Sequence, residues 1–134
     1  MNHWLLKSEP IAWSWEQQTK VKSTPWTGVR NHQAAANLRA MRVGDEAFFY
    51  HSNVGKEIVG IVRVTRAAYP DPTDDKGKFV CVDVAAVRAL PRSVALEEMK
   101  DNPELTGLAL LRQSRLSVMP ILVAHWKIIL QMSA

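Results

Sequence analysis

Cysteine is nearly absent from this chain of 134 residues, which contains only Cys81. A single cysteine excludes an internal disulfide and any metal site built from several thiolates. Cys81 lies in an apolar stretch rich in strand formers, so we expect it to be a small buried hydrophobic residue. The four histidines are far apart and have no cysteine partner, which is not typical of zinc ligands. The sequence therefore indicates no metal and no cofactor.

Long hydrophobic stretches are also missing. No segment approaches the roughly 18 consecutive apolar residues that a membrane-spanning helix needs. The first residues lack a basic region ahead of a long apolar segment, so they do not resemble a secretory signal peptide. With 47% hydrophobic residues and a mean hydropathy of -0.13, the composition is that of an ordinary soluble protein. We expect one cytoplasmic domain spanning residues 1–134, with no membrane partner.

Motifs of common enzyme families are absent as well. The chain has no phosphate-binding Walker loop, no glycine-rich dinucleotide motif and no Gly-x-Ser-x-Gly nucleophile elbow. Asp45, His51 and Ser52 have the residue types of a hydrolase triad, but nothing in their spacing favours one. The net charge of +4 favours a polyanionic partner only weakly, because no basic run accompanies it.

Tryptophan, by contrast, is abundant, and four of the five tryptophans lie within the first 26 residues. Tryptophan is costly to bury without a partner for its N–H group, and its ring is well suited to stacking on flat ligands. We interpret Trp13 and Trp15 as core or staple residues rather than as ligand contacts.

The chain is organised around residues 44–71, where two strands are predicted. Residues 47–50 and 58–64 are rich in strand formers, and a polar loop carrying His51 and Ser52 joins them. Gly60 indicates either a bulge or the close approach of another group. Polar side chains at the mouth of an apolar sheet are common at ligand sites.

Capping signals predict helices on both sides of these strands. Ser14 and Gln17 have the spacing of a capping box for a helix over residues 15–19, and residues 20–27 are predicted to form a loop. Asn31 is a good N-cap for a helix over residues 32–41.

The second half of the chain predicts one more strand and several helices. Residues 78–90 form a strand that Pro91 ends, and Ser93 caps a short helix. Asn102 caps another helix, which extends through Leu111, and a last helix covers residues 121–132. Strands and short helices alternate without a regular βαβ pattern, so we predict the α+β class with a small curved or closed sheet.

Four clusters place polar groups at the end of an apolar element. They are Lys7-Ser8-Glu9, residues 26–31, Tyr50-His51-Ser52 and residues 114–117. Each also has a simpler explanation: a solvated turn, a surface or ion-pairing arginine, a loop histidine, or serines that bond the nearby backbone.

The same clusters, in this order, closely resemble the EVE domain family. The motifs are Trp4-Leu5-Leu6-Lys7-Ser8-Glu9-Pro10, Trp26-Thr27-Gly28-Val29-Arg30-Asn31, Phe48-Phe49-Tyr50-His51-Ser52, Val59-Gly60-Ile61, Tyr69-Pro70-Asp71 and Ser114-Arg115-Leu116-Ser117-Val118. The resemblance implies a PUA-like fold, a small and mostly antiparallel β-barrel with short helices around it. It also implies a pocket beside the barrel that takes up one flipped, modified base. Members of the family are associated with modified cytosine in DNA, and relatives read modified RNA bases.

The resemblance and the chemistry of base binding together assign the candidate residues. A flipped base needs a flat aromatic surface, hydrogen-bonding groups for its edge and cations for the flanking phosphates. We expect Trp26 to provide the aromatic surface. Groups near Val29, together with Asn31 and Ser52, are expected to read the edge. The remaining candidates for holding phosphates or shaping the pocket are Lys7, Ser8, Glu9, Arg30, His51, Arg115 and Ser117.

Two alternatives remain open at this stage. Some ASCH relatives are hydrolases, and Lys7 and Glu9, two residues apart on a strand, would face the same side and could activate a nucleophile. A Lys7–Glu9 contact in the pocket would favour that enzyme, whereas a base-sized pocket lined by Trp26 without such a pair would favour a binding module. The second alternative is a protein-interaction domain with a vestigial pocket.

Overall fold

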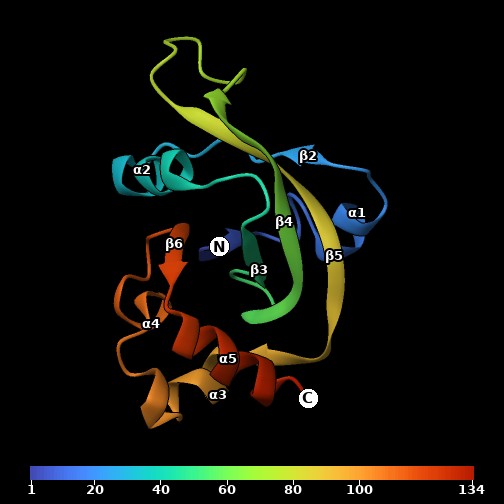
Figure 1. Ribbon diagram of the computed structural model, residues 1–134, viewed down its shortest axis with the longest axis vertical. Coiled ribbons are helices and arrows are strands. Elements are labelled where there is room, and N and C mark those ends of the chain that lie inside the picture. Colours follow the sequence, from blue (N-terminus) through green and yellow to red (C-terminus); the bar gives the residue numbers. More distant parts are fainter.

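One six-stranded sheet organises the fold in the computed structural model, which describes residues 1–134 (Figure 1). The strands are β1 (His3–Ser8), β2 (Thr24–Pro25), β3 (Glu46–His51), β4 (Glu57–Pro70), β5 (Val80–Ala95) and β6 (Val118–Ile121). They lie in the order β2-β5-β4-β3-β1-β6, and only the β1–β3 pair is parallel. The predicted α+β class and the mostly antiparallel sheet are confirmed.

The sheet curls but does not close into a complete barrel. Strands β2 and β6 lie at its two ends and each pairs on one side only, so the expected barrel is an open one. The long strands β4 and β5 supply the curvature, because their pairing shifts register at several points and each shift bends the strands. Their hairpin extends beyond the body of the molecule at the top of Figure 1.

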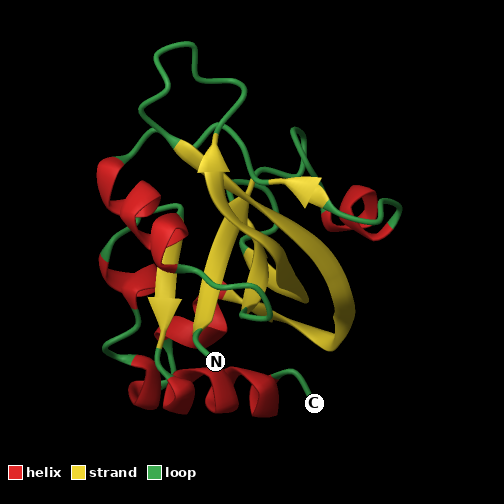
Figure 2. Ribbon diagram, turned by 45° about the horizontal axis from the view of Figure 1, so that its top comes forward, coloured by secondary structure: helices red, strands yellow, loops and turns green.

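Short helices surround this sheet. They are α1 (Trp15–Thr19), α2 (His32–Ala40), α3 (Leu96–Lys100), α4 (Ala109–Arg112) and α5 (Val123–Met132), with a 3-10 helix at Pro103–Leu105. Figure 2 shows α1 beside β2 on one side of the sheet, with the other helices toward the opposite side and the lower end. The caps predicted at Ser14 and Asn31 are confirmed, since Ser14 forms a capping box with Gln17 and Asn31 accepts a hydrogen bond from the Ala34 N–H group. None of the helices has the length and apolar character needed to cross a membrane.

Strand β3 separates two aromatic clusters of the core. Neighbouring residues of a strand point to opposite faces, so Phe48 and Phe49 contact different partners. Phe48 stacks on Trp126 of α5 with ring centroids 3.9 Å apart. Phe49 instead meets the edges of Trp15 and Trp26 at 5.3 and 5.6 Å. The Phe49 face therefore holds two of the N-terminal tryptophans.

Strand β5 continues past Pro91, contrary to the prediction. Its pairing with β4 jumps from Ala89 to Val94, so Pro91 lies in an irregular stretch where no ladder N–H group is needed. The helix expected after Ser93 begins only at Leu96, and the Ser93 hydroxyl donates to the Glu57 carboxylate at 3.1 Å instead of capping it.

Three other predictions about the elements were wrong in detail. The helix predicted from Asn102 through Leu111 is split into the 3-10 helix and α4, with Gly107, a poor helix former, between them. The predicted loop over residues 20–27 includes strand β2. The last helix, predicted over residues 121–132, begins only at Val123, so Leu122 precedes it and is exposed. Cys81, by contrast, is fully buried as expected.

Candidate functional site

A cavity of about 610 Å³ opens where β1 ends. This volume lies within the range of typical small-ligand sites, about 300–1,000 Å³. The residues that line the cavity are Lys7, Ser8, Glu9, Ala12, Trp13, Thr24, Pro25, Trp26, Thr27 and Gly28. The cavity therefore combines the end of β1, the segment that leads to α1, and β2 with the turn that follows it.

Lys7 and Glu9 both line the cavity, but they do not pair with each other. The Lys7 ammonium group donates to the backbone oxygen of Ser114 at 2.9 Å, and burial lowers its pKa. The Glu9 carboxylate forms no hydrogen bond or ion pair with any other residue. The Lys7–Glu9 contact that the hydrolase alternative requires is not formed.

Ser8 connects β1 to the segment that carries Trp13. Its hydroxyl donates to the backbone oxygen of Trp13, while its own backbone oxygen accepts from the Ser52 N–H group at 2.9 Å. The indole N–H of Trp13 donates to Gln18 at 2.9 Å, and Gln18 is fully buried. The position of Trp13 is thereby fixed from two sides. The sequence indicated a core or staple role for Trp13, but the structure places it in the lining of the cavity.

Trp26 belongs both to the core and to the cavity. Its side chain is 8% exposed and packs edge-on against Phe49, and its backbone N–H donates to Val82 on β5 at 2.7 Å. The indole Nε1–H of Trp26 has no acceptor within the protein, and this nitrogen is not completely shielded from solvent. Trp26 thus contributes a firmly held aromatic residue to the cavity lining, and its indole N–H remains an unused hydrogen-bond donor.

His51 and Gly60 hold the start of α1 through contacts with Trp15. The Trp15 backbone N–H donates to His51 Nε2 at 3.0 Å, so this nitrogen is unprotonated and acts as the acceptor. Burial lowers the pKa of His51, which favours that neutral form. The Trp15 ring lies directly over Gly60, where a Cβ atom would come within 2.4 Å of the ring. The close approach predicted at Gly60 is confirmed, and His51 supports the site without lining it.

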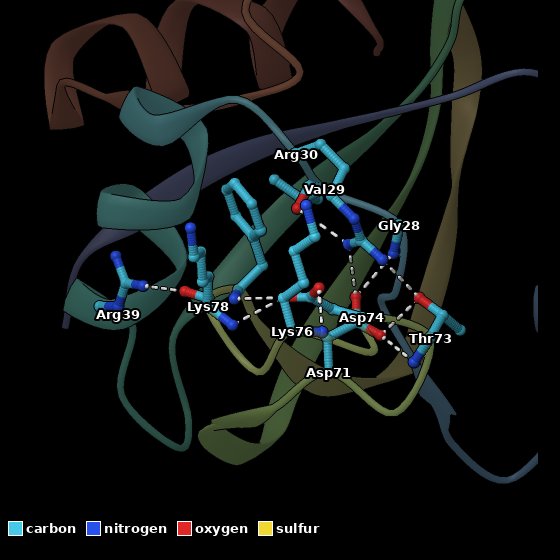
Figure 3. Close-up of polar contacts among 10 residues, drawn as sticks. Gly28, Val29, Arg30, Arg39, Asp71, Thr73, Asp74, Lys76 and Lys78 are labelled. Atoms are coloured by element: carbon cyan, nitrogen blue, oxygen red, sulfur yellow. Dashed lines mark hydrogen bonds and ion pairs between the residues drawn. The ribbon is translucent and has the colours of Figure 1, made fainter.

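Arg30 forms an ion pair with Asp71, a buried residue of the hairpin loop (Figure 3). One Asp71 carboxylate oxygen accepts from Arg30 at 3.1 Å and from the Gly28 N–H group at 2.8 Å, and the other accepts from the backbone and hydroxyl of Thr73. Burial alone would raise the pKa of Asp71, but the hydrogen bonds from Thr73, Gly28 and Arg30 lower it to about 2. Asp71 thereby fixes the turn at Gly28, whose φ of +86° suits glycine.

Known proteins share the sequence pattern of this chain. The profile of the EVE domain matches residues 2–132. The chain belongs to the EVE domain family. Rat thymocyte nuclear protein 1 is 36% identical to it, over 98% of this chain and 73% of the rat protein. The corresponding human protein is 34% identical over the same shares.

Solved structures show the same fold. A crystal structure of a protein from Agrobacterium tumefaciens is 45% identical to this EVE domain, with a TM-score of 0.97, and the match covers 100% of this chain and 94% of that one. Human THYN1 in complex with DNA that contains 5-methylcytosine is 32% identical, with a TM-score of 0.92 and coverage of 99% and 98%. An ASCH protein from Zymomonas mobilis shares the fold alone, at 7% identity and a TM-score of 0.62.

The predicted site residues of this EVE domain fall into three groups. Four of them line the cavity: Lys7, Ser8, Glu9 and Trp26. Asn31 and Arg115 line a neighbouring smaller hollow. The others lie outside both: Val29 is buried, Arg30 pairs with Asp71, His51 holds α1, and Ser52 and Ser117 bond the β1 backbone.

Sequence reasoning missed the lining residues Ala12, Trp13, Thr24 and Pro25, and it also missed the role of Asp71. Thr27 and Gly28 belong to the candidate cluster at residues 26–31, but they were given no role of their own. Trp13 could have been suspected from the cluster of tryptophans. The pairing of Asp71 with Gly28 and Arg30 spans more than 40 positions and leaves no local signal. The cytoplasmic location stays a prediction, and the mammalian relatives carry the word nuclear in their name.

Proposed function

We propose that this EVE domain binds DNA at a modified cytosine, whose base is flipped out of the stack into the cavity between Trp13 and Trp26. The observation that carries the proposal is the cavity itself. It has the volume of a small-ligand site, two indole side chains in its lining and unpaired polar groups beside them.

The polar groups of the cavity suit the edge of cytosine. A cytosine presents the N4 amine as a donor, and N3 and O2 as acceptors. Glu9 supplies an acceptor whose carboxylate is free, while Lys7 and the Trp26 indole N–H supply donors. Stacking on an aromatic side chain adds about 1–3 kcal/mol for each base.

The human relative supports the choice of DNA and of the modification. Human THYN1, which aligns with 99% of this chain, has been solved with DNA that contains 5-methylcytosine. The ASCH likeness, at 7% identity, is evidence for the fold only, and no Lys7–Glu9 contact supports a hydrolase. Reading of a modified RNA base is the second candidate, and the same assay tests it.

The test is a binding comparison on short oligonucleotides of one sequence. Fluorescence anisotropy is measured for DNA and RNA strands that carry cytosine or 5-methylcytosine at one central position. We expect the methylated DNA strand to bind more tightly than its unmodified counterpart. Equal affinity for the two DNA strands, or a preference confined to RNA, would contradict the proposal. Mass analysis of the nucleosides after prolonged incubation should show no product, and a product that disappears in a Glu9→Gln variant would establish the hydrolase instead.

A further inference from the structure

The smaller hollow beside the cavity, called the basic hollow below, is lined by residues that suit an anion. It has a volume of about 320 Å³ and is lined by Asn31, Gln33, Arg112, Gln113, Ser114, Arg115 and Leu116. Leu116 is the only hydrophobic residue in this lining, and no acidic residue contributes to it. Two guanidinium groups without an opposing carboxylate give the hollow a local positive charge.

The donors of this hollow are not consumed by the protein. Arg115 forms no hydrogen bond or ion pair, and Arg112 uses only its Nε–H, which donates to the Thr106 carbonyl at 3.1 Å. The Asn31 side-chain oxygen caps α2, which leaves its amide N–H groups free to donate. By contrast, Arg30 is neutralised by the buried Asp71 and offers much less free charge.

Lys7 connects the basic hollow to the cavity. Its side chain lines the cavity, and its ammonium group lies 2.9 Å from the backbone oxygen of Ser114, which belongs to the hollow. Buried Leu116 holds the segment of the two arginines against the body of the protein. An anion in the hollow would therefore lie next to a base in the cavity, as the phosphate of the same or an adjacent nucleotide does.

We propose that the basic hollow binds one backbone phosphate flanking the flipped nucleotide, with Arg115 and Arg112 as the charged donors and Asn31 and Gln33 as neutral ones. This inference rests on the proposed function, because it takes the base in the cavity as its point of reference. The hollow then fixes the register of the strand and carries no base preference of its own, since phosphates are the same in every sequence.

A double-mutant cycle with a chemically altered backbone tests the phosphate site. The probes are single strands with one 5-methylcytosine, either fully charged or with one neutral methylphosphonate on its 5′ or its 3′ side. We expect Arg115→Ala to weaken binding of the charged strand about five- to tenfold and to lower the log–log salt slope by about 0.7. One of the two methylphosphonate strands should weaken native binding by a similar factor and cause a clearly smaller loss in Arg115→Ala, where Arg112 is the one charged donor that remains.

The control variant is Lys127→Ala, which removes an exposed charge on α5 that has no ion pair. It should leave both the affinity and the response to methylphosphonate unchanged. Additive losses from Arg115→Ala and from both methylphosphonates would overturn the phosphate site. Equal affinity of the native domain for methylated and unmethylated strands would overturn the base-reading function instead, and the backbone cycle can still be measured in that case.

Discussion

Glu9 is the one acidic side chain that lines the cavity, and its carboxylate has no partner within the protein. A carboxylate accepts a hydrogen bond from the N4 amine of cytosine, but it repels the O4 carbonyl of thymine. Thymine is 5-methyluracil, so it matches 5-methylcytosine in its methyl group and differs only along the edge. This pair of bases isolates the contribution of Glu9.

We expect the native domain to prefer 5-methylcytosine over thymine at the flipped position by about 1–3 kcal/mol. In Glu9→Gln the preference should shrink, because an amide can donate to the thymine carbonyl. Competition binding with two strands that differ at this one base measures the change. The matched control is Glu97→Gln on α3, which exchanges an exposed carboxylate outside the cavity. An unchanged preference in Glu9→Gln would show that Glu9 does not read the edge.

Trp26 and Trp126 are almost equally buried, at 8% and 5% exposed, but only Trp26 lines the cavity. Each Trp→Ala change should cost about 3–5 kcal/mol of unfolding free energy, because each ring packs on a core phenylalanine. Only Trp26→Ala should also weaken base binding, by about 1–3 kcal/mol. Urea unfolding and binding at low temperature separate the two effects. Equal losses of affinity in both variants would mean that Trp26 acts through stability alone.

At the scale of elements, Asp71 joins the β4–β5 hairpin loop to the turn at the rim of the cavity. Its pKa is lowered from 3.8 to about 2, so the folded state loses the proton more readily than the unfolded state. The resulting stability is fully present above about pH 5 and is lost as the pH falls toward 2. Its size is on the order of 2 kcal/mol.

Urea unfolding of the native domain and of Asp71→Asn between pH 2 and pH 7 tests this link. We expect the variant to be less stable at neutral pH and to show a smaller fall in stability below about pH 4, because its amide does not titrate. Asp75→Asn, which alters an exposed carboxylate of the same loop that forms no ion pair, serves as the comparison. Parallel pH profiles for native protein and Asp71→Asn would contradict the assignment.

The elements that the sequence predicted well are those with a local signal. Caps such as Ser14 and Asn31 act within a few residues of themselves, and the strands around residues 44–71 carry dense β-branched and aromatic side chains. The prediction that Pro91 ends the strand was wrong, because a proline is tolerated where the register against β4 leaves its position unpaired. That register is not a local property of the sequence.

In the candidate site, too, residues with a local sequence signal were predicted and those placed by distant contacts were not. The end of β1 and Trp26 belong to compact sequence motifs and were found, whereas Trp13 lines the cavity only because Gln18 and Ser8 hold it there. His51 belongs to a motif too, but its task is to bond Trp15, which is 36 positions away in the chain. The motif thus pointed to His51 without revealing that it bonds the backbone of a neighbouring segment instead of lining the cavity.

At the scale of the whole molecule, positive charge is sparse and dispersed. The net charge is +4, and one of the arginines near the cavity is neutralised by Asp71. We expect contacts with only about two to four phosphates of a single strand, which corresponds to a log–log salt slope between about −1.5 and −3. Binding measured from low to moderate salt gives this slope directly. A slope near −10 would reveal an extended basic surface that the cavity and the basic hollow do not account for.

The contact between Trp15 and Gly60 gives strand β4 an influence on a cavity that it does not line. Because position 60 carries no side chain, Trp15 can sit directly on the sheet, and α1 brings Trp13 to its present distance from Trp26. We expect any larger residue at position 60 to displace Trp15 outward and, through the same segment, to shift Trp13 relative to Trp26. In the proposed base site, the room for a modified group would therefore depend on the absence of a Cβ atom at position 60, on the far side of Trp15. Related domains could acquire tolerance for bulkier modifications through this one position, with every residue in contact with the base unchanged.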